Sequence, residues 1–298
     1  MLDLMLPALV ASLILVGMHG YLGIHIIARG VIFVDLAIAQ VAAMGWAASS
    51  LGITQAIHGW IGIPEGVIAY GVGVAATLIA AWLFSITRTE HKYIPQEAII
   101  GIVFVVASAG TILLAAQSPR GAEHVEGLLT GNLLWVTWPQ ILRMAIIYAA
   151  IGVVHWLWRA RFFVISLQPD QAAARKWNLG LWDFAFYALF GIVVTASVEI
   201  AGVLIVFSSL VIPAVVAFLF TTSPGPLLFI AWVSGTVAVV FGLLASYQTD
   251  LPTGPMVVCS YALVLLAGFG VNALRQRLAV SRISVPKMQS GESSAESS

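Results

Sequence analysis

The sequence predicts an all-α protein that crosses a lipid bilayer eight or nine times, and three observations support this fold class. Of its 298 residues, 60% are hydrophobic and only 9% are charged, whereas about a quarter of the residues in soluble domains are charged. The mean hydropathy of +1.01 is too high for a polar surface to cover the chain. The apolar residues also fall into runs of about 20, the length that an α-helix needs to cross the hydrocarbon core.

Nine apolar segments are long enough to span a bilayer, and turn or charge signals separate them. They comprise residues 5–27, 31–51, 64–86, 98–117, 138–158, 182–198, 200–221, 226–247 and 256–274. The break near Glu199 is weak, because residues 182–221 are nearly continuous and too long for one span. This stretch forms either two tightly joined helices or one helix with a re-entrant or broken element, which leaves eight or nine spans.

The distribution of Lys and Arg predicts an outside N-terminus and a cytoplasmic C-terminus, because basic loop residues stay mainly on the cytoplasmic side. With residues 159–180 inside and two crossings by 182–221, all of the 13 basic residues except Arg120 and Arg143 fall inside. Residues 1–280 then form one transmembrane domain with a cytoplasmic loop at about 159–180. Residues 281–298 are polar, and we expect a disordered cytoplasmic tail.

Composition and motifs exclude several functional classes. The net charge of zero gives no sign of a nucleic-acid partner, and the single Cys259 cannot form an intrachain disulfide. The chain contains no zinc-protease, serine-hydrolase or phosphate-loop motif, so we expect that it does not hydrolyse nucleotides itself.

Asp35 is the first candidate site residue, because it lies within the apolar segment 31–51. An intramembrane carboxylate is costly and usually faces the interior of the helix bundle or a water-filled path. Asp35 is therefore either a ligand on a cation path or a structural acid that pairs with His25, Arg29 or another helix. Glu199 is a second acid, but its predicted place at the outer membrane surface makes a structural role more common.

The predicted cytoplasmic loop contains a short helix at 171–177. Asp170 is expected to cap this helix, Arg175 lies near its C-terminal end as the helix dipole favours, and Gly180 is expected to terminate the segment. Such a helix suits docking to a partner or contact with lipid. A plain connector is the alternative.

Five stretches of the chain occur in a specific order. They are Gly23–Asp35, with a basic residue six before an Asp; Glu126–Trp138; Gln168–Gly180; Ala201–Ala214; and Ser246–Pro255. In this order and spacing they resemble the permease subunits of bacterial ABC importers for zinc, manganese and iron, the ABC-3 family. The resemblance covers roughly residues 5–275 and implies a type II-like importer permease.

One departure from the family pattern concerns the metal path. The family usually has Asp and His at positions i and i+4, which share a helix face, whereas Ala39 follows Asp35 at i+4 here. The position of Gly45 suggests one inserted residue, which places Gln40 where the His would be. A π-bulge could absorb the insertion and turn Gln40 towards Asp35.

The resemblance implies that the chain is a transport subunit and not an enzyme, and that it imports a divalent metal ion across a bacterial inner membrane without a permanently bound cofactor. Its implied partners are a cytoplasmic ATP-binding subunit, an extracytoplasmic metal-binding protein, a second permease copy or paralogue, and lipid. We expect Asp35, Gln40 and Glu199 on the path, with Asp35 as metal ligand. The residues expected to couple to the ATPase are Gln168, Pro169, Asp170, Arg175 and Gly180. A metal chelate or other small cargo, and an ATP-independent secondary transporter, are the alternatives.

Overall fold

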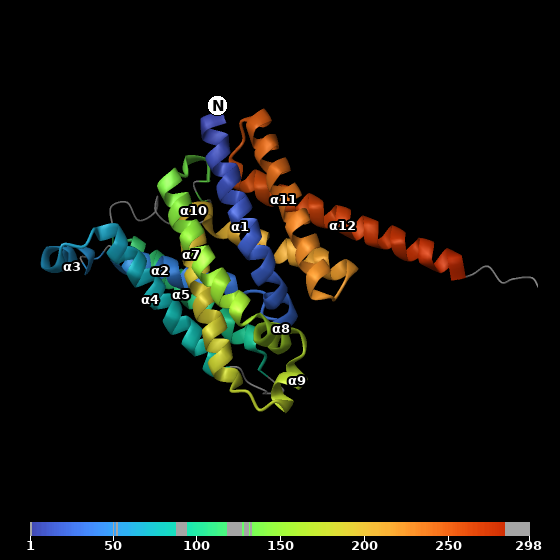
Figure 1. Ribbon diagram of the computed structural model, residues 1–298. Coiled ribbons are helices and arrows are strands. Elements are labelled where there is room, and N and C mark those ends of the chain that lie inside the picture. Colours follow the sequence, from blue (N-terminus) through green and yellow to red (C-terminus); the bar gives the residue numbers. More distant parts are fainter. Residues whose placement is uncertain are drawn as a thin grey trace, which may run out of the picture.

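Long α-helices make up most of the structure, which is a computed structural model of the chain (Figure 1). It describes residues 2–49, 51, 53–87, 94–117, 127, 131 and 133–283, and no strand occurs in these ranges. In chain order the helices are α1 (Leu2–Arg29), α2 (Val34–Ser49), α3 (Ile53–Ile61), α4 (Glu65–Ile86), α5 (Gln96–Ala115), η1 (Leu133–Trp135), α7 (Trp138–Leu157), α8 (Arg159–Leu167), α9 (Pro169–Ala174), α10 (Leu179–Phe220), α11 (Pro224–Thr249) and α12 (Thr253–Ile283). The predicted all-α class is confirmed for this part of the chain.

Seven of the described helices are long and apolar enough to cross a membrane, namely α1, α4, α5, α7, α10, α11 and α12. The pair α2 and α3 meets at a bend of 66° and would add an eighth span. The sequence predicts eight or nine, and the difference has two sources. The predicted span 31–51 contains α2, whose 16 residues reach only about 24 Å of a hydrocarbon core about 30 Å thick. The predicted spans 182–198 and 200–221 join in α10.

α10 consists of two helical arms that meet at Gly202. Its 42 residues would form a straight helix about 63 Å long, twice the thickness of the hydrocarbon core. The backbone breaks at Gly202, which has φ 75° and ψ 162°, a conformation that residues with a Cβ rarely adopt. This break lies next to Glu199, where the sequence shows only a weak turn signal.

The centre of the bundle is formed by α1 and α10. Their most apolar windows are 67% and 56% buried, against 17% for both α5 and α12. Gly23 of α1 lies so close to the Leu210 carbonyl of α10 that a Cβ at this position would overlap with it. Small residues allow such close helix packing in membranes, so the absence of a side chain at Gly23 brings the two central helices together.

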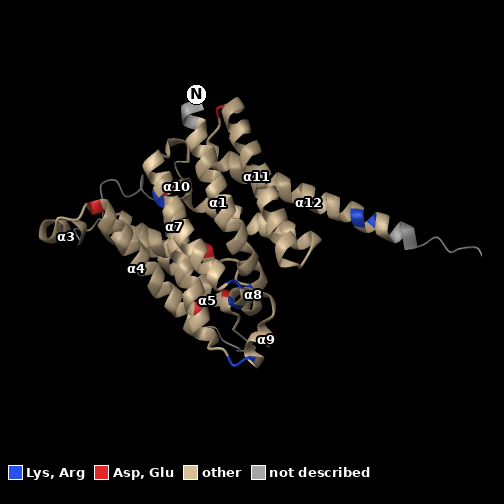
Figure 2. Cartoon of the chain, viewed as in Figure 1, with Lys and Arg blue, Asp and Glu red and all other residues tan. Residues whose placement is uncertain are grey.

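The two ends of the bundle differ in their short elements and charges. α8 and α9 lie at the end where α1 terminates, whereas α7 begins at the opposite end (Figure 1). Lys and Arg gather around α8 and α9 and on the C-terminal part of α12, which projects from the bundle (Figure 2). α12 continues to Ile283, three residues into the segment 281–298 for which the composition predicts a tail. Residues 284–298 lie outside the described ranges.

Candidate translocation path and coupling region

Asp35 is a buried carboxylate in the first turn of α2. Its side chain is 1% exposed, and Oδ1 accepts a hydrogen bond of 2.8 Å from the backbone N–H of Leu36. Oδ2 is buried and has no hydrogen-bond partner among the described residues. The pairing with His25 or Arg29 that the sequence left open does not occur, since both side chains bind other groups. A buried oxygen without a partner is costly. Oδ2 of Asp35 is therefore a ligand position that no described residue uses.

Gln40 is buried on the same helix but does not share a face with Asp35. α2 is α-helical from Val34 to Ser49 and contains no π turn, so the π-bulge that could have turned Gln40 towards Asp35 is absent from this helix. Five residues at about 100° each place the two side chains about 140° apart around the helix. The residue one turn after Asp35 is Ala39, which is buried and apolar. α2 therefore offers one charged ligand on the Asp35 face.

Glu199 takes part in an ion pair on α10 instead of joining Asp35. Its Oε1 accepts a hydrogen bond of 2.6 Å from Arg143 Nη2 of α7, and the side chains are 32% and 44% exposed. The Arg143 guanidinium also lies over the ring of Tyr70 at 5.6 Å. This contact between helices fits the structural interpretation of Glu199. In the described ranges no three His, Cys, Asp or Glu side chains lie close enough together to hold a metal ion.

The predicted coupling helix exists, although its register differs from the prediction. α9 begins at Pro169 with Gln168 as N-cap, and it ends at Ala174. Pro fixes the backbone angle of a first helical residue and needs no N–H there, so the helix starts two residues early. Asp170 consequently lies in the first turn and not at the cap, where its charge still suits the helix dipole. Arg175 is the C-cap residue.

The sequence suggested that Gly180 terminates a helix. In the structure it is instead the second residue of α10. Asn178 caps this helix by accepting a hydrogen bond of 3.1 Å from the backbone N–H of Leu181. The five predicted coupling residues, Gln168, Pro169, Asp170, Arg175 and Gly180, are all exposed. Ala172 is fully buried and anchors α9. The segment 168–180 thus presents a fixed, exposed surface.

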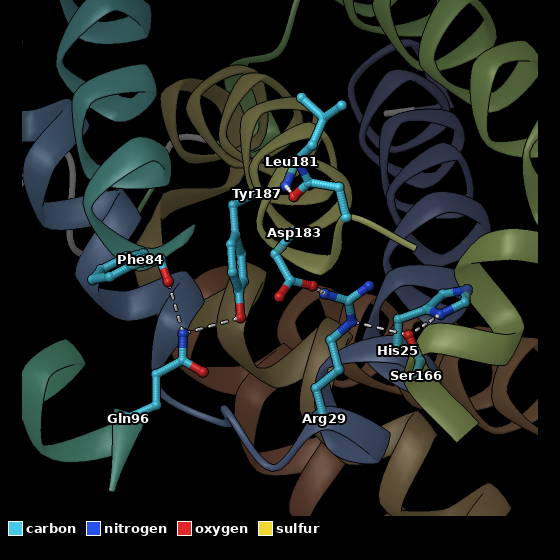
Figure 3. Close-up of polar contacts among 9 residues, drawn as sticks. His25, Arg29, Phe84, Gln96, Ser166, Leu181, Asp183 and Tyr187 are labelled. Carbon is cyan, nitrogen blue, oxygen red and sulfur yellow. Dashed lines mark hydrogen bonds and ion pairs between the residues drawn. The ribbon is translucent and has the colours of Figure 1, made fainter. Parts of the chain in front are cut away.

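A buried polar cluster beside this segment was missed by the sequence reasoning (Figure 3). Arg29 Nη1 donates to Asp183 Oδ1 at 2.7 Å, and the side chains are 7% and 2% exposed. Arg29 Nε donates to Ser166 Oγ at 2.9 Å, and the same oxygen lies 2.9 Å from His25 Nδ1. The cluster joins α1, α8 and α10. In the sequence, the carboxylate of Asp183 lies only at the edge of the predicted span 182–198.

Two further polar contacts connect α1 to α7 and α10. Ser197 Oγ lies 3.2 Å from His19 Nε2 and 2.5 Å from the Tyr148 hydroxyl. The Tyr21 hydroxyl lies 3.3 Å from His155 Nδ1. The two histidines of α1 thus contact different groups, since His19 contacts Ser197 and His25 contacts Ser166.

Comparison with known proteins shows what this chain is similar to. Residues 1–272 match a protein family described as the ABC 3 transport family. A probable iron transport system membrane protein of Haemophilus influenzae is 25% identical over 267 residues, which are 90% of this chain and 89% of the relative. The chelated iron transport system membrane protein YfeD of Yersinia pestis is 24% identical over 216 residues, 72% of this chain and 71% of the relative.

A third relative and a solved structure agree with this placement. The manganese transport system membrane protein MntB of Synechocystis is 26% identical over 198 residues, 66% of this chain and 63% of the relative. The structure of PsaBC from Streptococcus pneumoniae in complex with Fab has a TM-score of 0.70 at 21% identity and covers 88% of this chain and 90% of its own. The structural likeness shows a shared fold. The match over residues 1–272 shows that the chain belongs to the ABC 3 transport family, as a multi-span permease of an ABC transporter.

Proposed function

We propose that this chain is the membrane permease of an ATP-driven importer for divalent transition metal ions, zinc, manganese or iron, in which a separate subunit hydrolyses ATP. The observation that carries the proposal is Asp35, a buried carboxylate with one unused oxygen in a family of ABC permeases. A carboxylate in this setting is typical of an ion path through a membrane. The relatives named for iron and manganese transport support a metal as the cargo.

The segment 168–180 is the proposed docking site for the ATP-binding subunit. Its short helix α9 is exposed, is anchored by Ala172, and carries Asp170 and Arg175 at opposite ends. A partner bound to α9 can move α8 and α10, which precede and follow it in the chain. ATP-driven movement here would switch the path between outward- and inward-facing states.

A second permease copy or a paralogue, an extracytoplasmic metal-binding protein and the bacterial inner membrane complete the proposal. The helices α5 and α12 are largely unburied within one chain, so lipid or a second permease has to cover them. Two crossings by the arms of α10 remain our prediction, because Gly202 divides the helix near its middle.

A metal chelate is the second candidate cargo. Gln40, which stands where the family His was expected, lies on another face of α2 than Asp35, so the chain supplies fewer strong ligands for a bare ion. A relative named for chelated iron transport supports this alternative. A cargo that brings its own ligands needs fewer from the protein.

The proposal is tested by co-purifying the chain with its ATP-binding subunit and measuring uptake in proteoliposomes. Charge reversal at Asp170→Lys with Arg175→Glu is expected to abolish co-purification, whereas Glu65→Lys at the other end of the bundle is the matched control. Absence of any ATP-binding subunit with the wild-type chain would contradict the ABC assembly.

Uptake of Mn²⁺, Fe²⁺, Zn²⁺ and a ferric chelate is then compared for wild type, Asp35→Asn and Glu199→Gln. Asp35→Asn is expected to lower metal uptake at least about tenfold, which equals about 1.4 kcal/mol, because the amide lacks the negative charge. Glu199→Gln is expected to retain uptake. Unchanged metal uptake in Asp35→Asn would reject Asp35 as a metal ligand, and uptake of the chelate alone would favour the second cargo.

A further inference from the structure

The side chain of Arg29 holds both flanks of the docking segment 168–180. Ser166, which accepts a hydrogen bond from Arg29 Nε at 2.9 Å, lies just before this segment. Asp183, which accepts one from Nη1 at 2.7 Å, lies just after it. Figure 3 shows the guanidinium between these two partners, which come from α8 and α10. The segment that contains α9 therefore lies between two residues that both bind α1.

Arg29 is also the last residue of α1 and opens the turn that leads to Asp35. Gly30 has a positive φ of 68°, which turns the chain sharply at the end of the helix. Within this turn, the backbone N–H of Ile32 donates to the carboxylate of Glu97 on α5. α2 begins at Val34 and brings Asp35 in its first turn. A displacement of Arg29 therefore reaches the candidate path residue through a few backbone units.

Burial limits the groups that the Arg29 guanidinium can bind. The Arg29 guanidinium lies 4.0 Å from the centre of the Phe186 ring, and His25, one turn earlier on α1, contacts the same Ser166 oxygen at 2.9 Å. A buried ion pair alone is weak evidence for a role in stability, because apolar residues often replace it without loss. The planar fork of Arg can bind two acceptors at once, which a Lys cannot do in the same way.

One hydrogen-bond donor of the Arg29 guanidinium is also unpaired. Nη2 is buried and has no hydrogen-bond partner among the described residues. Because an unpaired buried donor is costly, a rearrangement that supplies an acceptor would be favoured. The cluster is therefore suited to exchange partners when the flanks of α9 move.

We propose that Arg29 is a positioning residue for transport: its contacts with Ser166 and Asp183 transmit movement of α9 to the α1–α2 turn and so to Asp35. This inference rests on the proposed function, because it requires an ATP-binding subunit that moves α9. Arg29 touches neither cargo nor nucleotide in this scheme. Its loss should separate ATP hydrolysis from uptake and leave subunit assembly intact.

The test uses the whole complex with its ATP-binding subunit in proteoliposomes, and records ATP hydrolysis and Mn²⁺ uptake together. Arg29→Lys keeps the charge but loses the fork, and Ser166→Ala removes one flank contact. The matched controls are Arg143→Lys in the half-exposed pair and Ser209→Ala, a buried hydroxyl bonded within its own helix. We expect both cluster variants to assemble and to lower uptake per ATP hydrolysed at least about fivefold, while both controls match wild type.

The outcomes separate this inference from the proposed function. A wild-type complex without ATP-dependent uptake would overturn the proposed function and the inference with it. A working wild type, with Arg29→Lys and Ser166→Ala at wild-type uptake per ATP, would overturn the role of Arg29 alone. If Arg29→Lys fails to assemble, Ser166→Ala decides, because its effect on the ratio of uptake to hydrolysis supports or overturns the transmission.

Discussion

At the scale of single residues, two ion pairs of the structure differ in their environment. Arg29 and Asp183 are almost fully buried, whereas Arg143 and Glu199 are partly exposed to their surroundings. Exposed pairs gain little because water and salt screen them. Removal of one partner from a buried pair leaves an uncompensated charge away from water. The loss of an ion pair is therefore expected to have different consequences at the two ends of the bundle.

This contrast predicts unequal effects on stability. Asp183→Asn is expected to lower the free energy of unfolding by about 3–5 kcal/mol, whereas Arg143→Gln is expected to lower it by less than about 1 kcal/mol. Thermal unfolding of the purified variants in one detergent measures the difference. Equal losses for the two variants would show that burial of the pair does not determine its contribution.

The burial of a polar residue could be predicted from the sequence where that residue alone carries the signal. Asp35 was found because a carboxylate inside an apolar run is costly, and the structure shows it buried. Asp183 carries the same signal but lies at the edge of the predicted span 182–198, where a carboxylate is cheap. Its partner Arg29 lies 154 residues away in the sequence, and no local pattern reveals such a contact.

At the scale of elements, hydropathy predicted where helices occur but not how they break. The predicted spans 64–86 and 138–158 closely match α4 and α7, and a Pro marks the start of each helix. The stretch 182–221 was left open, since its apolar composition hides the break at Gly202. The start of α9 was misplaced because the capping preference of Asp was weighed above the preference of Pro for a first helical turn.

The break in α10 predicts a strong dependence on glycine. Gly202→Ala is expected to destabilise the protein by about 1–2 kcal/mol, because a Cβ disfavours a positive φ. Gly152→Ala on α7 is the control, since a Cβ there meets no other atom within 4 Å and Ala favours helix by about 1 kcal/mol. Unfolding midpoints of both variants should move in opposite directions, and a neutral Gly202→Ala would argue against the kink.

At the scale of the whole molecule, charge and hydropathy predicted the architecture better than any site. Among the described residues, seven long apolar helices form the bundle, and two of them, α1 and α10, make its centre. Lys and Arg gather around α8 and α9 (Figure 2). These properties sum over many residues, so single errors cancel. The cluster of Arg29 depends on three helices packing in one arrangement, which composition does not encode.

The charge distribution predicts which end faces the cytoplasm. In a Cys259→Ser background, Gln55→Cys is expected to react with a membrane-impermeant maleimide added outside intact spheroplasts, because α3 lies at the outer end in the predicted orientation. Asp170→Cys is expected to react only after the membrane is opened. Labelling of Asp170→Cys in intact spheroplasts would reverse the orientation and remove α9 from reach of a cytoplasmic ATPase.

The kink of α10 also has a mechanical consequence. Its first arm is fixed to α1 where Asp183 meets Arg29, and its second arm is fixed to α1 where Leu210 meets Gly23. α1 therefore contacts α10 on both sides of the break at Gly202. The angle between the two arms of α10 can therefore change only if α1 slides or tilts with them. The flexibility that Gly202 gives to α10 thus becomes a motion shared by both central helices.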